Sequence, residues 1–148
     1  QMYGLPPSLI EVEITGGQWL HCHPAALPQL RAMAAAGVRV AIDDFGSGYS
    51  NFGYLAEVPI SHIKIDRSLI TGLADSRTAR LKVDAIIRLA EQLGYRTVAE
   101  GVEHEAELEL LRAWGCDEAQ GFHLARPMRA EAVTQLVLAC RAGPLADA

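Results

Sequence analysis

VAIDDFGSGYS, residues Val40–Ser50, joins an apolar strand to two adjacent carboxylates and a loop with two glycines. Neighbouring carboxylates repel each other and lose hydration when buried, so Asp43 and Asp44 are tolerated mainly where a cation lies between them. Gly46 and Gly48 let the backbone turn sharply and come close to a ligand. The stretch therefore predicts a cation site at the end of a strand. A surface turn is the alternative, because Asp and Gly are ordinary turn residues.

The composition is that of one folded domain without a basic surface. The chain has 148 residues, half of them apolar, which is enough to bury a core. Its net charge of -5 argues against nucleic acid as a partner, although metal ions would still let an acidic chain hold a phosphate. Cys22, Cys116 and Cys140 are widely separated and are expected to be reduced thiols in the cytoplasm. No apolar run approaches the ~18 residues of a membrane span, and nothing resembles a signal peptide.

Strand and helix patterns alternate along the chain. The predicted strands are Ser8–Thr15, Val38–Ile42, His62–Ile65, Arg96–Ala99 and Glu118–Gln120. The predicted helices are Pro24–Ala36, Tyr49–Glu57, Ser76–Leu93, His104–Trp114 and Arg129–Ala142. This alternation predicts an α/β fold with mostly parallel strands, right-handed crossovers and flanking helices.

Polar residues recur where the predicted strands end. They are Glu13, Asp43 with Asp44, Lys64, Glu100 and Gln120. The carboxyl ends of parallel strands gather on one rim, where ligands bind. Oxygen ligands suit Mg²⁺ or Mn²⁺, and two such ions can drive an in-line displacement at phosphorus. The pattern thus favours phosphate ester hydrolysis, with structural ion pairs at the strand ends as the alternative.

Five successive runs resemble the signatures of the EAL-domain family. They are EVEIT (Glu11–Thr15), DDFGSGYS (Asp43–Ser50), HIKIDRSLI (His62–Ile70), TVAEGVE (Thr97–Glu103) and AQGFHLARPM (Ala119–Met128). The resemblance covers nearly the whole chain in the family's order. It implies a TIM-type (β/α) barrel and a cytoplasmic bacterial signalling enzyme that hydrolyses cyclic di-GMP to linear pGpG with two Mg²⁺ or Mn²⁺ ions. It also implies sensory or GGDEF domains upstream.

The same resemblance implies roles for individual residues. The implied metal ligands are Glu13, Asp43, Asp44, Asp66 and Glu100. Lys64 would hold or deprotonate the attacking water, Glu100 would also be a general base, and Gln120 would touch the water or the substrate. The implied loop residues are Gly46, Ser47, Gly48 and Glu103, and the implied groove residues are Phe122, Arg126 and Pro127.

The chain departs from the family pattern by lacking the E-A-L run and the next strand with its metal-binding Asn. A TIM-type barrel needs about 200 residues or more, so residues 1–142 are expected to form roughly the C-terminal 60 per cent of a barrel whose first strands are missing. Residues 143–148 are expected to be a disordered tail. Exposed sheet edges recruit other chains, so we expect a homodimer that covers the gap or an origin within a longer protein.

Gly16 stands where the family pattern has a Glu that orders the DDFG loop, which predicts a looser loop and slower turnover. A degenerate domain that only binds cyclic di-GMP or a protein partner is therefore the second hypothesis, and an unrelated metal-dependent barrel enzyme, such as an enolising lyase, is the third. His21-Cys22-His23 is interpreted as an ordinary loop rather than a metal clip, and His62 as an interior histidine. Glu105, Glu107 and Glu109 are predicted to form a solvated helix face.

Overall fold

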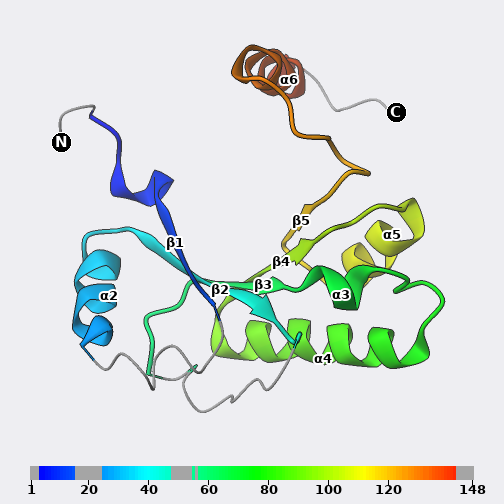
Figure 1. Cartoon of the computed structure of the whole chain (residues 1–148), viewed down its shortest axis with the longest axis horizontal. Helices are drawn as coiled ribbons and strands as arrows, with labels where there is room; N and C mark the ends of the chain where they lie inside the picture. The colour runs from blue at the N-terminus through cyan, green and yellow to red at the C-terminus, as the bar shows by residue number, and fades with distance from the viewer. Residues whose placement is uncertain (1–3, 16–24, 48–54, 56, 143–148) are drawn as a thin grey trace.

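In the computed structural model, residues 4–15, 25–47, 55 and 57–142 are described. They contain five parallel strands whose order in the sheet follows the chain. The strands are β1 (Glu11–Thr15), β2 (Arg39–Phe45), β3 (His62–Ile65), β4 (Arg96–Glu100) and β5 (Glu118–Gln120). The helices are the 3-10 turn η1 (Pro7–Leu9), α2 (Ala26–Ala35), α3 (Arg67–Ile70), α4 (Arg77–Leu93), α5 (Glu105–Ala113) and α6 (Ala130–Ala142). This arrangement confirms the predicted α/β class (Figure 1).

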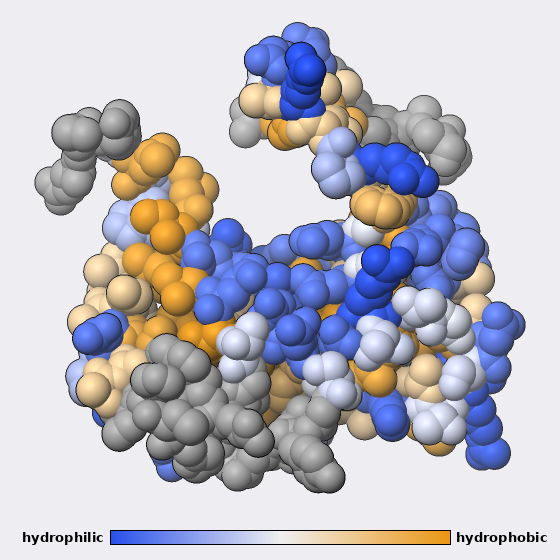
Figure 2. All heavy atoms as spheres, in the orientation of Figure 1, coloured by the Kyte–Doolittle hydropathy of each residue, from blue (hydrophilic) through white to orange (hydrophobic). Residues whose placement is uncertain are grey.

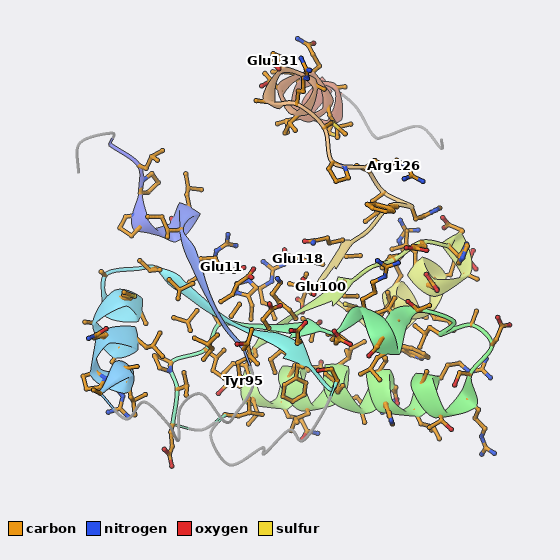
Figure 3. All side chains as sticks on the ribbon, viewed as in Figure 1. Glu11, Tyr95, Glu100, Glu118, Arg126 and Glu131 are labelled. Atoms are coloured by element: carbon orange, nitrogen blue, oxygen red, sulfur yellow. The ribbon has the colours of Figure 1, made fainter. Side chains whose placement is uncertain are left out.

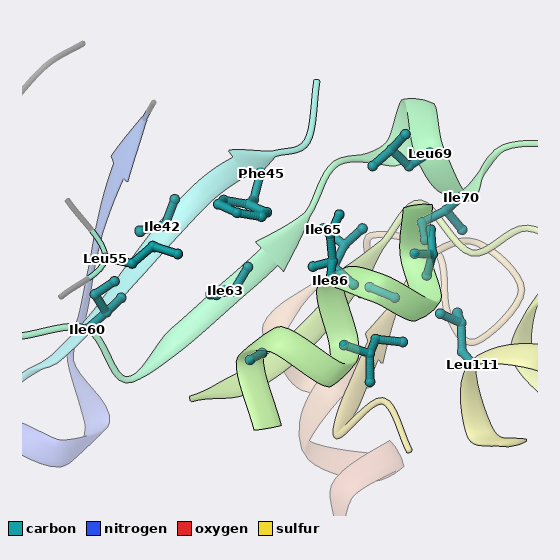
Figure 4. Close-up of a cluster of buried hydrophobic side chains, with 14 of the residues drawn as sticks. Ile42, Phe45, Leu55, Ile60, Ile63, Ile65, Leu69, Ile70, Ile86 and Leu111 are labelled. Carbon is teal, nitrogen blue, oxygen red and sulfur yellow. The ribbon is translucent and has the colours of Figure 1, made fainter. Parts of the chain in front are cut away.

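One face of the sheet is apolar and packs against the helices. Ile63 and Ile65 of β3 are fully buried, and they belong to the same cluster as Ile86 of α4 and Leu111 of α5 (Figure 4). Burying one such side chain contributes about 1.5–3 kcal/mol. The core therefore lies between the strands and helices α3 to α5, and it holds the strands in register.

Helix α4 forms where its apolar stripe and its end signals agree. The Ser76 hydroxyl accepts a hydrogen bond from Ala79 N at 3.2 Å and caps the first turn. Gly94 ends the helix at a φ of 75°, which a residue with a side chain rarely adopts. The buried residues Val83, Ile86, Ile87 and Ala90 form the stripe.

The other face of the sheet is polar. Because side chains alternate along a strand, His62 and Lys64 lie opposite Ile63 and Ile65, yet all of these residues are buried. Barrel interiors are usually filled with Val, Ile and Leu. Figure 3 shows Glu11, Glu100 and Glu118 gathered over this polar face. The inner surface is thus built around charged groups.

Three local features differ from the sequence-based expectations. The first strand begins at Glu11 rather than Ser8, because Pro7 starts a 3-10 turn and lacks the N–H that a ladder needs. Strand β2 continues to Phe45, which is buried, with a register shift after Ile42. Helix α3 was not predicted. Predictions for Gly16, for the His21–His23 motif, for Gly48, for most of Tyr49–Glu57 and for residues 143–148 fall outside the described residues.

Two groups of exposed apolar side chains flank an open hollow. Leu5, Leu9 and Ile10 precede β1, and Val133 and Val137 belong to α6. Figure 2 shows that the molecule is hollowed between the segment before β1 and α6, and that apolar residues line this segment. In the described parts of the chain, β1 pairs only with β2, and β5 pairs only with β4. No helix among these residues has the length and apolar character needed to span a membrane.

Candidate functional site

Lys64 lies at the centre of a cluster of carboxylates from three other strands. Its ammonium nitrogen donates to Glu13 Oε1 at 2.7 Å, and it lies 2.7 Å from Glu100 Oε1 and 3.2 Å from Asp43 Oδ1. The strands β1, β2 and β4 supply these partners, and β3 supplies the lysine. The structure therefore brings together at one place four residues that are up to 87 positions apart in the chain (100 − 13 = 87).

The lysine is held in its charged form. Burial lowers the pKa of Lys64, but its contacts with Glu100, Glu13 and Asp43 outweigh burial, so the pKa lies above the usual value. An ammonium donates hydrogen bonds and cannot accept a proton. In this arrangement Lys64 is an ammonium that can hold a water or a phosphate oxygen by donating hydrogen bonds to it.

Asp43, Asp44 and Glu100 form a second overlapping cluster. One carboxylate oxygen from each lies within 4.8 Å of the other two. Asp43 Oδ1 is buried, and the Lys64 ammonium lies 3.2 Å from it in an ion-pair contact. Three carboxylates that bring one oxygen each this close together fit a hard divalent cation. The donor set therefore fits Mg²⁺ or Mn²⁺.

Asp44 occupies a strained and electrostatically unfavourable position. Its φ of 53° is left-handed, a region that Asp tolerates at a cost of about 1–2 kcal/mol relative to the right-handed region. Asp44 is exposed, yet a partial loss of hydration and then the neighbouring carboxylates of Asp43 and Asp66 raise its pKa, while Lys64 opposes them. Strain and repulsion at one residue indicate a position kept for binding rather than for stability.

Asp66 links the cluster to helix α3. It is the N-cap of α3, and its Oδ1 accepts hydrogen bonds from Ser68 N at 2.9 Å and from the Ser68 hydroxyl. These bonds fix the carboxylate beside Asp44. All five predicted metal ligands thus lie at the carboxyl ends of the strands: Glu13, Asp43, Asp44, Asp66 and Glu100.

The loop after β2 packs tightly against α3. Gly46 has a φ of 95°, and a Cβ there would lie 2.5 Å from Leu69 Cδ1. The Ser47 hydroxyl donates to the Asp44 carbonyl at 2.8 Å. Glycine is therefore favoured at position 46, because residues with a side chain rarely adopt this left-handed backbone conformation and because Leu69 would have to move to admit a Cβ.

A groove of about 710 Å³ opens beside Glu100. Its walls include Arg67, Glu103, Gln120, Phe122, Arg126, Pro127 and, from α6, Val133 and Leu136. The guanidinium carbon of Arg126 lies 4.8 Å from the centre of the Phe122 ring, which is a cation–π contact. Figure 3 shows Glu100 and Arg126 on the same side of the sheet. The predicted groove residues therefore line one hollow next to the carboxylate cluster.

Sequence reasoning missed two residues at this rim. Glu107 was predicted to face solvent, but this was wrong: only 2% of its surface is exposed. Its carboxylate accepts hydrogen bonds from backbone N–H groups, and this satisfies it in the interior. A Glu three residues after a helix N-cap is a known capping pattern, which could have revealed it. Arg67 was not singled out, although it donates to Glu103 Oε1 at 2.6 Å.

His62 lies in the interior of the sheet as predicted, with 4% of its surface exposed. Its Nδ1 is 2.8 Å from the Ser61 hydroxyl, whereas its buried Nε2 has no hydrogen-bond partner within the described parts of the chain. Glu105 and Glu109 are exposed as predicted.

Comparison with known proteins gives consistent results. Residues 1–127 match the family described as EAL domain. A cyclic di-GMP phosphodiesterase of Pseudomonas aeruginosa is 43% identical over 129 residues, which are 87% of this chain and 22% of that protein. The phosphodiesterase of MucR, also from P. aeruginosa and in complex with cyclic di-GMP, has a TM-score of 0.82 at 42% identity, covering 89% of this chain and 53% of that one.

A third similar protein is BlrP1 of Klebsiella pneumoniae, solved with manganese and cyclic di-GMP. Its TM-score is 0.78 at 36% identity, and the match covers 85% of this chain and 32% of that one. The chain thus spans about a fifth of the first curated relative and about half of the MucR structure.

Proposed function

Because this chain belongs to the EAL domain family, we propose that it forms the metal-binding part of a cyclic di-GMP phosphodiesterase within a longer protein. The observation that carries the proposal is the convergence of Glu13, Asp43 and Glu100 on Lys64 at the ends of parallel strands. Two similar structures hold cyclic di-GMP, and one of them also holds manganese. The groove beside Glu100 is the corresponding place for a dinucleotide here.

The proposed reaction is attack by water on one phosphorus of cyclic di-GMP. Two Mg²⁺ or Mn²⁺ ions, when bound, supply charge that lowers the pKa of water and offsets the charge of the phosphodiester. The residues that would hold these ions are Glu13, Asp43, Asp44, Asp66 and Glu100. The oxygen of the water forms the new P–O bond, the P–O3′ bond breaks, and the released O3′ takes up a proton, which yields linear pGpG.

The chain's own residues have separate tasks in this reaction. Glu100 takes the proton of the attacking water as general base. Lys64, as an ammonium, holds that water or a phosphate oxygen and offsets the repulsion between the carboxylates around it. Gln120 orients the water or the substrate through its amide. Phe122 and Arg126, with Pro127, line the groove for the nucleotide.

The loop residues support the aspartate pair. Gly46 allows the close approach to α3, and Ser47 bonds the Asp44 carbonyl. Gly48 belongs to the same loop in the sequence. Glu103 acts through Arg67, which it holds at the edge of the groove.

The test uses the full-length parent protein with Mn²⁺ and cyclic di-GMP, and chromatography to detect pGpG. We expect pGpG from the wild type, and a loss of at least about 100-fold in kcat for Asp43→Asn and Glu100→Gln, as is typical when a group acting in the transition state is removed. Glu109→Gln is the matched control, because Glu109 is exposed on α5 away from the groove lining. The absence of pGpG from the wild type would refute the proposal.

The second candidate is a domain that binds cyclic di-GMP or a protein partner without cleavage. Gly16 favours it, because a glycine offers no side-chain acceptor where the family pattern has a Glu. Gly16→Glu discriminates the two functions, since a slow enzyme should become faster whereas a receptor should not. Upstream sensory or GGDEF domains are proposed partners in the same chain, and the relative MucR carries the name of a bifunctional diguanylate cyclase and phosphodiesterase.

A further inference from the structure

Helix α3 is tied to the segment that follows β4. At the first residue of α3, Arg67 Nη2 donates to Glu103 Oε1 at 2.6 Å. Just beyond the end of α3, Gly72 N donates to Glu107 Oε1 at 3.2 Å. Two contacts on opposite ends of such a short helix fix its position against its neighbour.

The second contact belongs to a carboxylate that joins two backbone segments. Glu107 Oε2 accepts hydrogen bonds from Glu103 N at 2.9 Å and from His104 N at 3.1 Å, while its Oε1 serves Gly72 N. Hydrogen bonds to an ionised acceptor are stronger than neutral ones, and the start of α5 favours a negative charge at this place. Glu107 is buried, so water does not compete for these bonds.

The two tied segments carry different parts of the carboxylate cluster. Asp66 is the N-cap of α3, and Glu100 is the last residue of β4. The two segments are in contact at this point, because a Cβ on Gly101 would lie 2.3 Å from Arg67 Cγ. Loss of the Glu107 contacts would free the two segments at Gly72 and at Glu103 and His104, which follow Asp66 and Glu100 closely in the chain.

We propose that Glu107 is a positioning residue that sets the spacing between Asp66 and Glu100 for metal binding and turnover. This inference rests on the function proposed above. Misplacing a reacting group by about 1 Å can reduce the rate about 100-fold, and partners behind metal ligands typically contribute about 10- to 100-fold in affinity or activity. Glu107 contacts neither substrate nor metal in this role, because it acts through the backbone of the Gly101–His104 segment.

The experiment compares Glu107→Ala, Glu107→Gln and Glu109→Ala in the full-length protein. Glu107→Ala removes all three acceptor contacts, whereas Glu107→Gln keeps an amide oxygen for Glu103 N and His104 N. Glu109→Ala is the matched control, because Glu109 is exposed on the same helix. Hydrogen exchange of the backbone amides, calorimetric Mn²⁺ titration and cyclic di-GMP turnover are measured for each variant.

In Glu107→Ala we expect hydrogen exchange at the amides of Gly72, Glu103 and His104 to be at least about 10-fold faster than in the wild type. We also expect Mn²⁺ binding to be about 10-fold weaker, and kcat to fall with little change in KM. Glu107→Gln should restore the exchange rates of Glu103 and His104 and most of the Mn²⁺ affinity. Unchanged Mn²⁺ affinity in a folded Glu107→Ala protein would overturn the inference. If Glu107→Ala does not fold, amide exchange at Gly72 that is as slow in Glu107→Gln as in the wild type would overturn it, because Glu107→Gln loses the acceptor for Gly72 N.

The readouts separate this inference from the proposed function. A wild type that binds Mn²⁺ but makes no pGpG refutes the phosphodiesterase, while the exchange and titration results still decide the role of Glu107. A wild type that makes pGpG, together with a Glu107→Ala protein that is equally active, refutes the positioning role alone.

Discussion

Gly121 is the position where one added methyl group should do most damage. A Cβ there would lie 2.0 Å from Val102 O and 2.3 Å from Val102 N, well below the 3.0 Å that real Cβ atoms keep. The end of β5 would have to move by about 1 Å or more, which breaks the bonds Val102 N to Gln120 O (3.0 Å) and His123 N to Val102 O (3.1 Å). Val102 is fully buried, so each orphaned group costs about 1–3 kcal/mol. We therefore expect Gly121→Ala to lower the free energy of unfolding by about 2–5 kcal/mol.

The assay is urea denaturation followed by circular dichroism, with Gly94→Ala as the matched control. Gly94 has a φ of 75° and open space around it, so an alanine there adds only left-handed strain of about 1–2 kcal/mol. Gly121 also borders the groove, and its displacement should raise the KM for cyclic di-GMP. The packing argument fails if Gly121→Ala proves no less stable than Gly94→Ala.

Three further predictions follow from the charged cluster and the cysteines. Lys64→Met should lower kcat by about 100-fold or more, because it removes the ammonium that holds water; activity within about 3-fold of wild type would contradict this. The pKa of Asp44 is raised by a partial loss of hydration and by Asp43, although the residue is exposed, so its ionised form slightly destabilises the metal-free fold at neutral pH, and this cost disappears as the pH falls through the raised value. We therefore expect Asp44→Asn to have a higher melting temperature than the wild type in EDTA at pH 7. We also expect it to lose the increase in melting temperature that Mn²⁺ gives the wild type. A melting temperature in EDTA below that of the wild type would contradict this reasoning. Burial raises the pKa of the Cys116 thiol, so iodoacetamide should label it more slowly than the exposed Cys140, as mass spectrometry can measure.

The sheet and its flanking helices could be predicted because their signals are local. Alternation of His62, Ile63, Lys64 and Ile65 gives a strand, and Ser76 with Gly94 marks the limits of α4. The start of β1 was misplaced because Pro7 prevents a ladder, which a pattern of β-branched residues does not reveal. Helix α3 is too short for any periodic signal to predict it.

The candidate site could be predicted for those of its residues that lie at the carboxyl ends of strands. Asp43, Lys64 and Glu100 each end or nearly end a strand, so parallel packing alone brings them together. Glu107 does not follow a strand, so this rule does not apply to it. The capping pattern after His104 could have indicated its bonds with Glu103 N and His104 N, but not its bond with Gly72 N, which is 35 residues away in the chain. Whether a glutamate on a helix is solvated or buried depends partly on backbone N–H groups that come close to it only in the folded chain.

The groove beside Glu100 has one stiff wall and one compliant wall. The stiff wall is formed around Gly101 and Gly121, where backbone and side chains already touch. The compliant wall is α6, which contributes Val133 and Leu136 although its side chains from 130 to 140 are all exposed. A helix with so little buried surface yields at low energetic cost. Within the described residues, the wall around Gly101 and Gly121 is the part of the groove held by close backbone contacts, and it therefore defines the shape of the groove.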